Sequence, residues 1–145
     1  MAKKKKLGIR LEIKGGKADV ISPDYWGEIH IMQGDEEVGK VGFTISDEKI
    51  YVDDFNVNDG FRQTGYGSIM MDVVKGIARF MQKPVHLYSS AESPPFYKKM
   101  GFVSIEDPEM RKRIWIKKGS NPKENDFLWI PECFDGRRKK FRMEI

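Results

Sequence analysis

The chain has 145 residues, which is enough for one hydrophobic core, and we expect residues 1–145 to form a single domain. The net charge is +4 and the isoelectric point about 9.1, but residues 18–59 are acidic while both ends are basic, which argues against a simple nucleic-acid-binding protein. No apolar run reaches the roughly 18 residues of a membrane span, and no secretory signal is recognisable. One cysteine and two histidines exclude an intramolecular disulfide and predict no metal site, so we expect a reducing, cytoplasmic setting.

Four runs of alternating apolar and polar residues in the first half of the chain predict β-strands. They occupy residues 7–14, 27–33, 37–45 and 50–57, with turn-rich gaps between them. Such gaps favour antiparallel neighbours, so the runs predict a meander. Residues 1–6, with four consecutive lysines, precede it as a basic tail.

The spacing of apolar residues then changes to that of a helix. Ile69, Val73 and Ile77 recur at every fourth position, and charged residues lie on the opposite side. This predicts an amphipathic helix over residues 68–81. Residues 85–88 predict a short apolar strand.

The second half of the chain predicts a short helix and several further strands. Pro94 and Pro95 fit the first turn of this helix, which ends at Gly101. Strand-like runs follow at residues 101–106, 113–118, 126–134 and 139–145. The order of strands, helix, strand, helix and strands predicts an α/β (α+β) domain with two main helices.

Gly65 and Gly67 stand directly before the longer predicted helix. A glycine turn at a helix start favours anion binding, because free backbone N–H groups and the helix dipole face a ligand that glycine allows to approach. The P-loop pattern requires a lysine where Tyr66 stands, and the dinucleotide-binding pattern requires a glycine where Met70 stands, so neither is predicted. The alternative is that Gly65 and Gly67 form a tight turn that binds no ligand. Gly60 indicates only a turn.

A third pattern fits this loop. Arg62, Gly65 and Gly67 give R-x-x-G-x-G, and the arginine stands five residues after Val57. This arrangement resembles the acetyl-coenzyme A loop of the GNAT superfamily of N-acetyltransferases. The resemblance extends over about residues 34–104.

A second segment, SSAESPPFYKKMGF, resembles the family's N-x-x-A-x-x-[FL]-Y-x-x-x-G-F motif. Phe96, Tyr97 and Gly101 match the motif, whereas Ser90 and Ser93 replace its asparagine and alanine. A serine at position 90 still has a hydroxyl that can donate a hydrogen bond to the pantetheine arm of the coenzyme.

The resemblance implies a GNAT-like fold and acetyl-coenzyme A as co-substrate. In that fold a mixed, mostly antiparallel central sheet splays between its fourth and fifth strands, and the pantetheine arm lies in the gap. The resemblance implies coenzyme contacts from Phe55, Val57, Arg62, Gln63, Thr64, Gly65, Tyr66, Gly67, Ser68, Ser90 and Phe96.

The resemblance also implies direct transfer of an acetyl group to a primary amine. Tyr97 would then protonate the leaving thiolate as a general acid, although a tyrosine here can also simply pack at the helix end. Asp54 or Asp53 is the candidate base, and strand alternation would place the two on opposite faces. Glu28 is a weaker candidate. Both aspartates can equally be solvated strand charges, with water taking the proton.

The acidic character of residues 18–59 favours a cationic acceptor, namely a lysine side chain, a protein N-terminus or a small polyamine. Binding of nucleic acid by the basic ends is not favoured, and no membrane partner is expected. The alternative function is a catalytically silent GNAT-fold module that binds nucleic acid or a protein partner. The oligomeric state stays open, with a homodimer among the options.

Two regions depart from the family pattern. Residues 15–27 leave little room for the two helices that follow the family's first strand. Residues 119–145 extend the chain, either as an extra C-terminal β-hairpin or as part of the final strand pair, with residues 113–118 as an insertion. His30 and His86 lie within strand patterns and are predicted to be structural.

Overall fold

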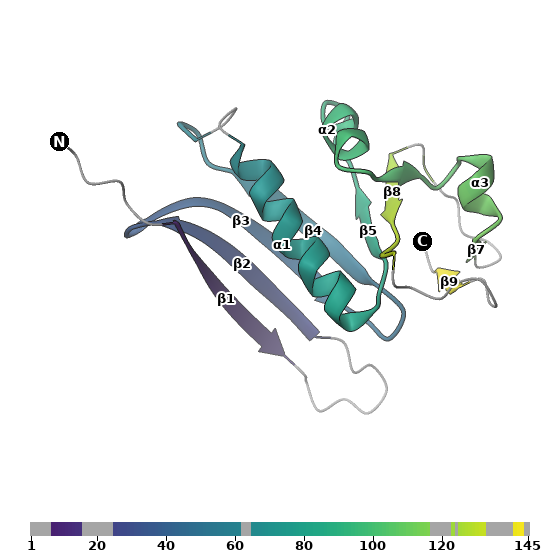
Figure 1. Cartoon of the computed structure of the whole chain (residues 1–145), viewed down its shortest axis with the longest axis horizontal. Helices are drawn as coiled ribbons and strands as arrows, with labels where there is room; N and C mark the ends of the chain where they lie inside the picture. Colours follow the sequence, from purple (N-terminus) through teal and green to yellow (C-terminus); the bar gives the residue numbers. More distant parts are fainter. Residues whose placement is uncertain are drawn as a thin grey trace.

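The computed structural model of the chain describes residues 7–15, 25–61, 65–116, 123, 125–132 and 141–143. Its elements are β1 (Leu7–Gly15), β2 (Tyr25–Gln33), β3 (Glu36–Ile45), β4 (Ile50–Val57), α1 (Tyr66–Met81), β5 (Val85–Tyr88), α2 (Pro94–Lys99), β6 (Val103–Ser104), α3 (Pro108–Arg111), β7 (Ile114–Ile116), β8 (Asp126–Trp129) and β9 (Phe141–Met143). Seven strands form one mixed sheet in the order β1-β2-β3-β4-β5-β8-β6, and α1 lies across one of its faces (Figure 1). The predicted basic tail, residues 1–6, and Cys133 lie outside the described residues.

The first four strands form the antiparallel meander that the sequence predicts. Alternate side chains of β2, β3 and β4 point toward α1 and are buried beneath it. The core between sheet and helix contains Ile29, Ile31, Val41 and Phe43 from the strands and Met70, Met71, Val74 and Ala78 from α1. The helix begins at Tyr66, two residues earlier than predicted, and ends at Met81 as predicted.

β4 and β5 run parallel but pair along only part of their length. The paired residues are Ile50–Val52 and Val85–Leu87, and no further pairing joins the two strands in the described part of the chain. β4 nevertheless continues to Val57, so its edge from Asp53 onward has no strand on that side. The splay implied by the family resemblance is therefore present.

In the part of the C-terminal segment that the structure describes, β8 and β9 do not pair with each other as the predicted extra β-hairpin requires. β8 lies between β5 and β6 in the main sheet, whereas β9 pairs in parallel with β7. This arrangement agrees in part with the other prediction, in which the C-terminal extension joins the final strand pair and residues 113–118 are an insertion: β8 pairs with β6, whereas β9 pairs with β7 inside the insertion. α3, which precedes this insertion, is not predicted by the sequence analysis. Its start is marked by Asp107, whose carboxylate accepts hydrogen bonds from the backbone N–H groups of Glu109 and Met110.

A β-bulge in β3 changes which side chains face the core. Val38 is the extra residue between two register positions of β2. It is fully buried, and a Cβ at the next residue, Gly39, would stand 2.6 Å from Met70 Sδ, so both residues face α1. The bulge turns Glu37 to the other face of the sheet, where it contacts His30. The face of β1–β4 turned away from α1 is called the open face below.

We predict opposite effects for a methyl group at Gly39 and at Gly76. A methyl group at Gly39 would collide with Met70 Sδ and with the backbone oxygen of Asn56, 2.7 Å away, and such overpacking costs about 1–3 kcal/mol. At Gly76 in α1 it meets nothing within 4 Å in the described part of the chain, and alanine should stabilise the helix by about 0.5–1 kcal/mol. Urea unfolding of Gly39→Ala and Gly76→Ala measures both. A Gly39→Ala protein as stable as Gly76→Ala would contradict this packing.

Candidate active site

A cleft of about 680 Å³ opens beside the unpaired part of β4. Its walls come from β4, the start of α1, the segment after β5 and α2. The lining residues are Phe55, Asn56, Val57, Phe61, Gly65, Gly67, Ser68, Ser90, Ser93, Phe96, Tyr97 and Lys99. Figure 1 shows the N-terminal end of α1 and the short helix α2 at the same end of the sheet. The splay of the strands and the two helices thus enclose one cavity.

Most residues with an implied coenzyme contact lie together in this cleft. The structure gathers Phe55, Val57, Gly65, Gly67, Ser68, Ser90 and Phe96, and Tyr97 lies with them. Tyr66 is not among the lining residues, because its ring packs edge-on against Phe61, with centroids 5.9 Å apart. Arg62, Gln63 and Thr64 lie outside the described residues, so their contacts stay a prediction.

Four lining residues are absent from the sequence prediction, namely Asn56, Phe61, Ser93 and Lys99. Asn56 lies between Phe55 and Val57, the two predicted contact residues on β4. A prediction that extended the contact along the whole strand edge would have included Asn56. Lys99 stands three residues after Phe96 on α2, which places both on one side of the helix. The family motif alone has no signal for Phe61.

The two loop glycines have different structural roles. Gly65 precedes α1 with φ of 88°, a left-handed conformation that glycine adopts without strain. The first turn of α1 then has backbone N–H groups without partners inside the helix, and none of its described residues is acidic. A Cβ at Gly67 would lie 3.3 Å from the ring of Phe96, so this glycine allows α1 and α2 to approach closely. The helix start is therefore suited to hold an anion at the cleft.

An aromatic cluster packs the side chain of Tyr97 of α2 against β4 and β8. Its ring centroid lies 5.3 Å from that of Phe96 and 6.1 Å from that of Phe55. The rings of Phe102 and Phe127 pack against it at 5.9 Å and 6.3 Å. Tyr97 is consequently 7% exposed although it lines the cleft. Such packing holds a side chain in one position without ordering cost at the moment of binding.

The electrostatic surroundings of Tyr97 favour the neutral phenol. Burial raises the pKa of Tyr97, and the negative charge of Asp54 raises it further. The ordinary pKa of a phenol is about 10, so Tyr97 stays protonated throughout the neutral range. A protonated phenol at the wall of the cleft is able to act as a proton donor.

A second β-bulge brings Asp53 and Asp54 to the same face of the sheet. Asp53 is the extra residue in the pairing of β4 with β3. Its carboxylate accepts a hydrogen bond of 2.7 Å from Thr44 Oγ1, and the carboxylate of Asp54 lies 3.8 Å from Lys40 Nζ. Thr44 and Lys40 are an even number of residues apart on β3 and share the open face. The expectation of opposite faces is therefore wrong, because the bulge cancels the alternation.

The comparisons with known proteins agree with this geometry. Residues 27–118 match the family model of the acetyltransferase (GNAT) domain. The chain belongs to the GNAT acetyltransferase family. A comparison with curated protein sequences gives no match. None of the helices in the described residues is both long and apolar enough to cross a membrane.

Solved structures of low sequence identity share the fold of this GNAT protein. Tetrahymena GCN5 is 16% identical, with 72% of this chain and 68% of that chain covered and a TM-score of 0.58. Escherichia coli ElaA is 19% identical, with 81% and 74% covered and a TM-score of 0.52. The Bacillus subtilis N-acetyltransferase YlbP, solved in complex with coenzyme A, is 20% identical, with 77% and 69% covered and a TM-score of 0.50. At these identities the similarity establishes the fold alone.

We expect Tyr97 to ionise at higher pH than an ordinary tyrosine. Spectrophotometric titration of the wild type and of Tyr97→Phe measures this, because the difference between the two curves is the ionisation of Tyr97. We expect the midpoint of that difference above pH 10. Asp54→Asn should move this transition part of the way down, because the effect of burial remains. Since the folded pKa lies above the unfolded value, Tyr97 contributes stability that is present below about pH 10 and lost as the pH rises through the folded pKa. A transition at or below pH 10 would contradict the buried environment.

Proposed function

We propose that the protein is an acetyl-coenzyme A-dependent N-acetyltransferase that moves an acetyl group to a primary amine by direct attack. The observation that carries the proposal is the cleft, where the start of α1, the open edge of β4 and Tyr97 meet. One part of this cleft is suited to hold an anion, and another presents a protonated phenol. Acetyl-coenzyme A requires both an anion-binding site and a proton donor. Its phosphates are anionic, and its sulfur leaves as a thiolate when the acetyl group is transferred.

The chemistry of the cleft fits the two polar parts of coenzyme A. The backbone N–H groups at the start of α1 would hold the pyrophosphate, and Ser68 adds a hydroxyl there. Lys99 is the charged residue among the described residues of the lining, and its sign suits a phosphate. The β4 edge at residues 55–57 would pair with the amides of the pantetheine arm. Residues 62–64 complete the loop in this proposal, and the related fold of YlbP, solved with coenzyme A, supports it.

Acetyl transfer begins when a neutral amine nitrogen attacks the thioester carbonyl carbon. A C–N bond forms, the C–S bond breaks, and the sulfur leaves as a thiolate that takes the phenol proton of Tyr97. The raised pKa of Tyr97 keeps this proton in place until the thiolate develops. An ammonium acceptor must first lose a proton, and Asp54, Asp53 or a water molecule would receive it. The attacking nitrogen becomes positively charged as the C–N bond forms and releases a proton to solvent to give the neutral amide, and solvent returns a proton to the phenolate of Tyr97.

The charges of β4 favour a cationic acceptor. Asp53 and Asp54 are both exposed on the open face, and Asp54 is close enough to Tyr97 to affect its pKa. Carboxylates beside a cleft attract an ammonium group and raise its local concentration. The proposed acceptor is therefore a lysine side chain, a protein N-terminus or a small polyamine, all of which are cationic before they react.

Replacing Ser68 by glutamate should separate coenzyme binding from stability. An acidic residue in the first turn of a helix is stabilising by about 0.3–1 kcal/mol, so Ser68→Glu should unfold at the same temperature as the wild type or slightly higher. The same charge would repel the pyrophosphate and fill part of the cleft, so the affinity for acetyl-coenzyme A should fall at least about 10-fold. Calorimetric titration measures the affinity. Gly76→Glu, on the same helix outside this lining, is the control, and equal affinities for the two variants would disprove this location.

Removing the phenol of Tyr97 should affect turnover more than binding. Tyr97→Phe keeps the aromatic packing but has no proton to donate, so kcat should fall by about 100-fold or more while the affinity for acetyl-coenzyme A stays within a few-fold. A thiol-release assay across lysine peptides, N-terminal peptides and polyamines measures turnover. Unchanged turnover would exclude Tyr97 as the acid. Binding of acetyl-coenzyme A without thiol release by any amine would instead indicate a catalytically silent binding module.

A further inference from the structure

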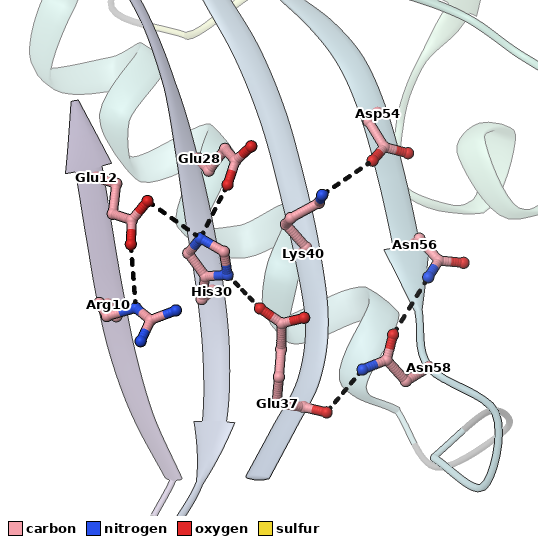
Figure 2. A network of polar contacts seen from close by, with 9 residues as sticks. All are labelled: Arg10, Glu12, Glu28, His30, Glu37, Lys40, Asp54, Asn56 and Asn58. Atoms are coloured by element: carbon pink, nitrogen blue, oxygen red, sulfur yellow. Dashed lines mark hydrogen bonds and ion pairs between the residues drawn. The ribbon is translucent and has the colours of Figure 1, made fainter. Parts of the chain in front are cut away.

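Four titratable side chains from three strands converge on the open face of the sheet, away from the coenzyme cleft. Glu12 comes from β1, Glu28 and His30 come from β2, and Glu37 comes from β3 (Figure 2). One ligand atom from each of Glu12, Glu28 and His30 lies within 4.8 Å of the other two. The proposed acetyl transfer uses none of these side chains, and the sequence analysis treats His30 as structural.

His30 is the buried centre of this cluster. Its side chain is 8% exposed, and its Nδ1 makes a short hydrogen bond with the carboxylate of Glu37. Its Nε2 is out of reach of solvent and has no hydrogen-bond partner in the described part of the chain. An imidazole that donates its Nδ1–H to a carboxylate has a lone pair on Nε2. In this tautomer the unpartnered Nε2 is an acceptor, and a positive partner would satisfy it.

Two carboxylate oxygens lie beside His30 Nε2, but neither is placed to accept a hydrogen bond from it. Glu28 Oε2 lies 3.1 Å from His30 Nε2, and Glu12 Oε2 lies 3.8 Å from it. The other oxygen of Glu12 is 3.5 Å from Arg10 Nε, which leaves Oε2 free of that ion pair. A cation among these three atoms would stabilise them, because with a neutral imidazole all three are electron-rich.

We propose that Glu12, Glu28 and His30 bind a divalent first-row transition-metal cation, with Glu37 orienting the imidazole. A carboxylate that accepts from the far ring nitrogen of a metal-bound histidine is a common arrangement, because it fixes the tautomer and the ring plane. A histidine nitrogen together with two carboxylate oxygens suits Zn²⁺ and Mn²⁺ better than Mg²⁺ or Ca²⁺, which take oxygen ligands. This assignment is independent of the proposed acetyl transfer.

The spacing of the three ligand atoms distinguishes a metal ion from an ammonium group of a substrate. Ligand atoms about 2.0–2.2 Å from one zinc ion lie about 3.0–3.5 Å from each other. Acceptors that share one ammonium group at about 2.8 Å lie about 4.0–4.6 Å apart. The observed 3.1 Å between Glu28 and His30 fits a metal, and Glu12, at 3.8 Å, reaches the same range by a shift of a few tenths of an ångström. The distance between Glu28 Oε2 and His30 Nε2 is too short for two acceptors of one ammonium group, so this pair favours a metal ion.

A cation at this position would join three strands of the meander. β1 is an edge strand, and Leu7, Ile9 and Leu11 on it are exposed. A bond from Glu12 to an ion that is also held by β2 would secure this edge in the register that pairs Glu12 with Glu28. The expected consequence is a higher unfolding temperature in the presence of the metal.

Zinc titration of the chelator-treated full chain tests the proposal. We expect calorimetry to show one Zn²⁺ per chain and a higher unfolding temperature than in the presence of chelator. Glu28→Gln and His30→Gln should each weaken zinc binding about 100-fold or more, and Glu37→Gln about 10–100-fold. Glu36→Gln is the matched control, because Glu36 is an exposed neighbour on β3 outside the cluster, and its zinc affinity should equal that of the wild type.

Two results would overturn the metal site. One is the absence of zinc binding by the chelator-treated wild type, and the other is zinc binding by Glu28→Gln as tight as by the wild type. Cobalt titration checks the ligand set, since a thiolate-to-cobalt charge-transfer band would place the metal at Cys133 and exclude the site proposed. If His30→Gln fails to fold, Glu12→Gln provides the second variant, because the Glu12 side chain is 39% exposed and its replacement leaves no cavity.

Discussion

β4 and β5 pair at Ile50–Val52 with Val85–Leu87 and then separate, although β4 continues to Val57. The strands are held apart by aromatic rings, because Phe96 and Tyr97 of α2 pack against Phe55 where β5 would otherwise continue. The separated edge of β4 has backbone groups that must find partners other than a strand. The cleft, with the start of α1 at one wall and the phenol of Tyr97 at another, is a consequence of this one separation.

The aromatic rings of Phe55 and Phe96 also connect the loop glycines to the site. Phe96 lies between Phe55 and the start of α1, and a Cβ at Gly67 would touch its ring. Gly65 has the different task of turning the chain into the helix with a positive φ. The pair of glycines therefore sets the width of the cleft as well as the access to backbone N–H groups. A larger residue at Gly67 would displace α2 through the ring of Phe96, even without a phosphate bound in the cleft.

The sequence predicts the parts of the fold that follow regular periodicity. Strands that alternate and a helix with four-residue spacing are recognised because each buries one face against the other. The two bulges break this rule. At Val38 and Asp53 one extra residue reverses the alternation, so Glu37 and Asp53 reach the open face although counting back from the C-terminal end of each strand would place them on the core face. The contact of Glu37 with His30 therefore has no signal in the sequence pattern. The sequence predicts the C-terminal strands but leaves their pairing open, because the partner of β8 is set by the tertiary fold, which local composition does not contain.

The open face and the cleft are joined by a continuous set of polar contacts (Figure 2). His30 contacts the carboxylate of Glu37, whose backbone oxygen accepts a hydrogen bond of 2.7 Å from Asn58 Nδ2. Asn58 in turn accepts a bond of 3.3 Å from Asn56, a residue of the cleft lining. Contact alone is not coupling, which requires an element with two arrangements that both sites influence. The network therefore argues for a positional effect, in which fixing His30 and Glu37 also fixes the end of β4, and with it the point where the glycine loop begins.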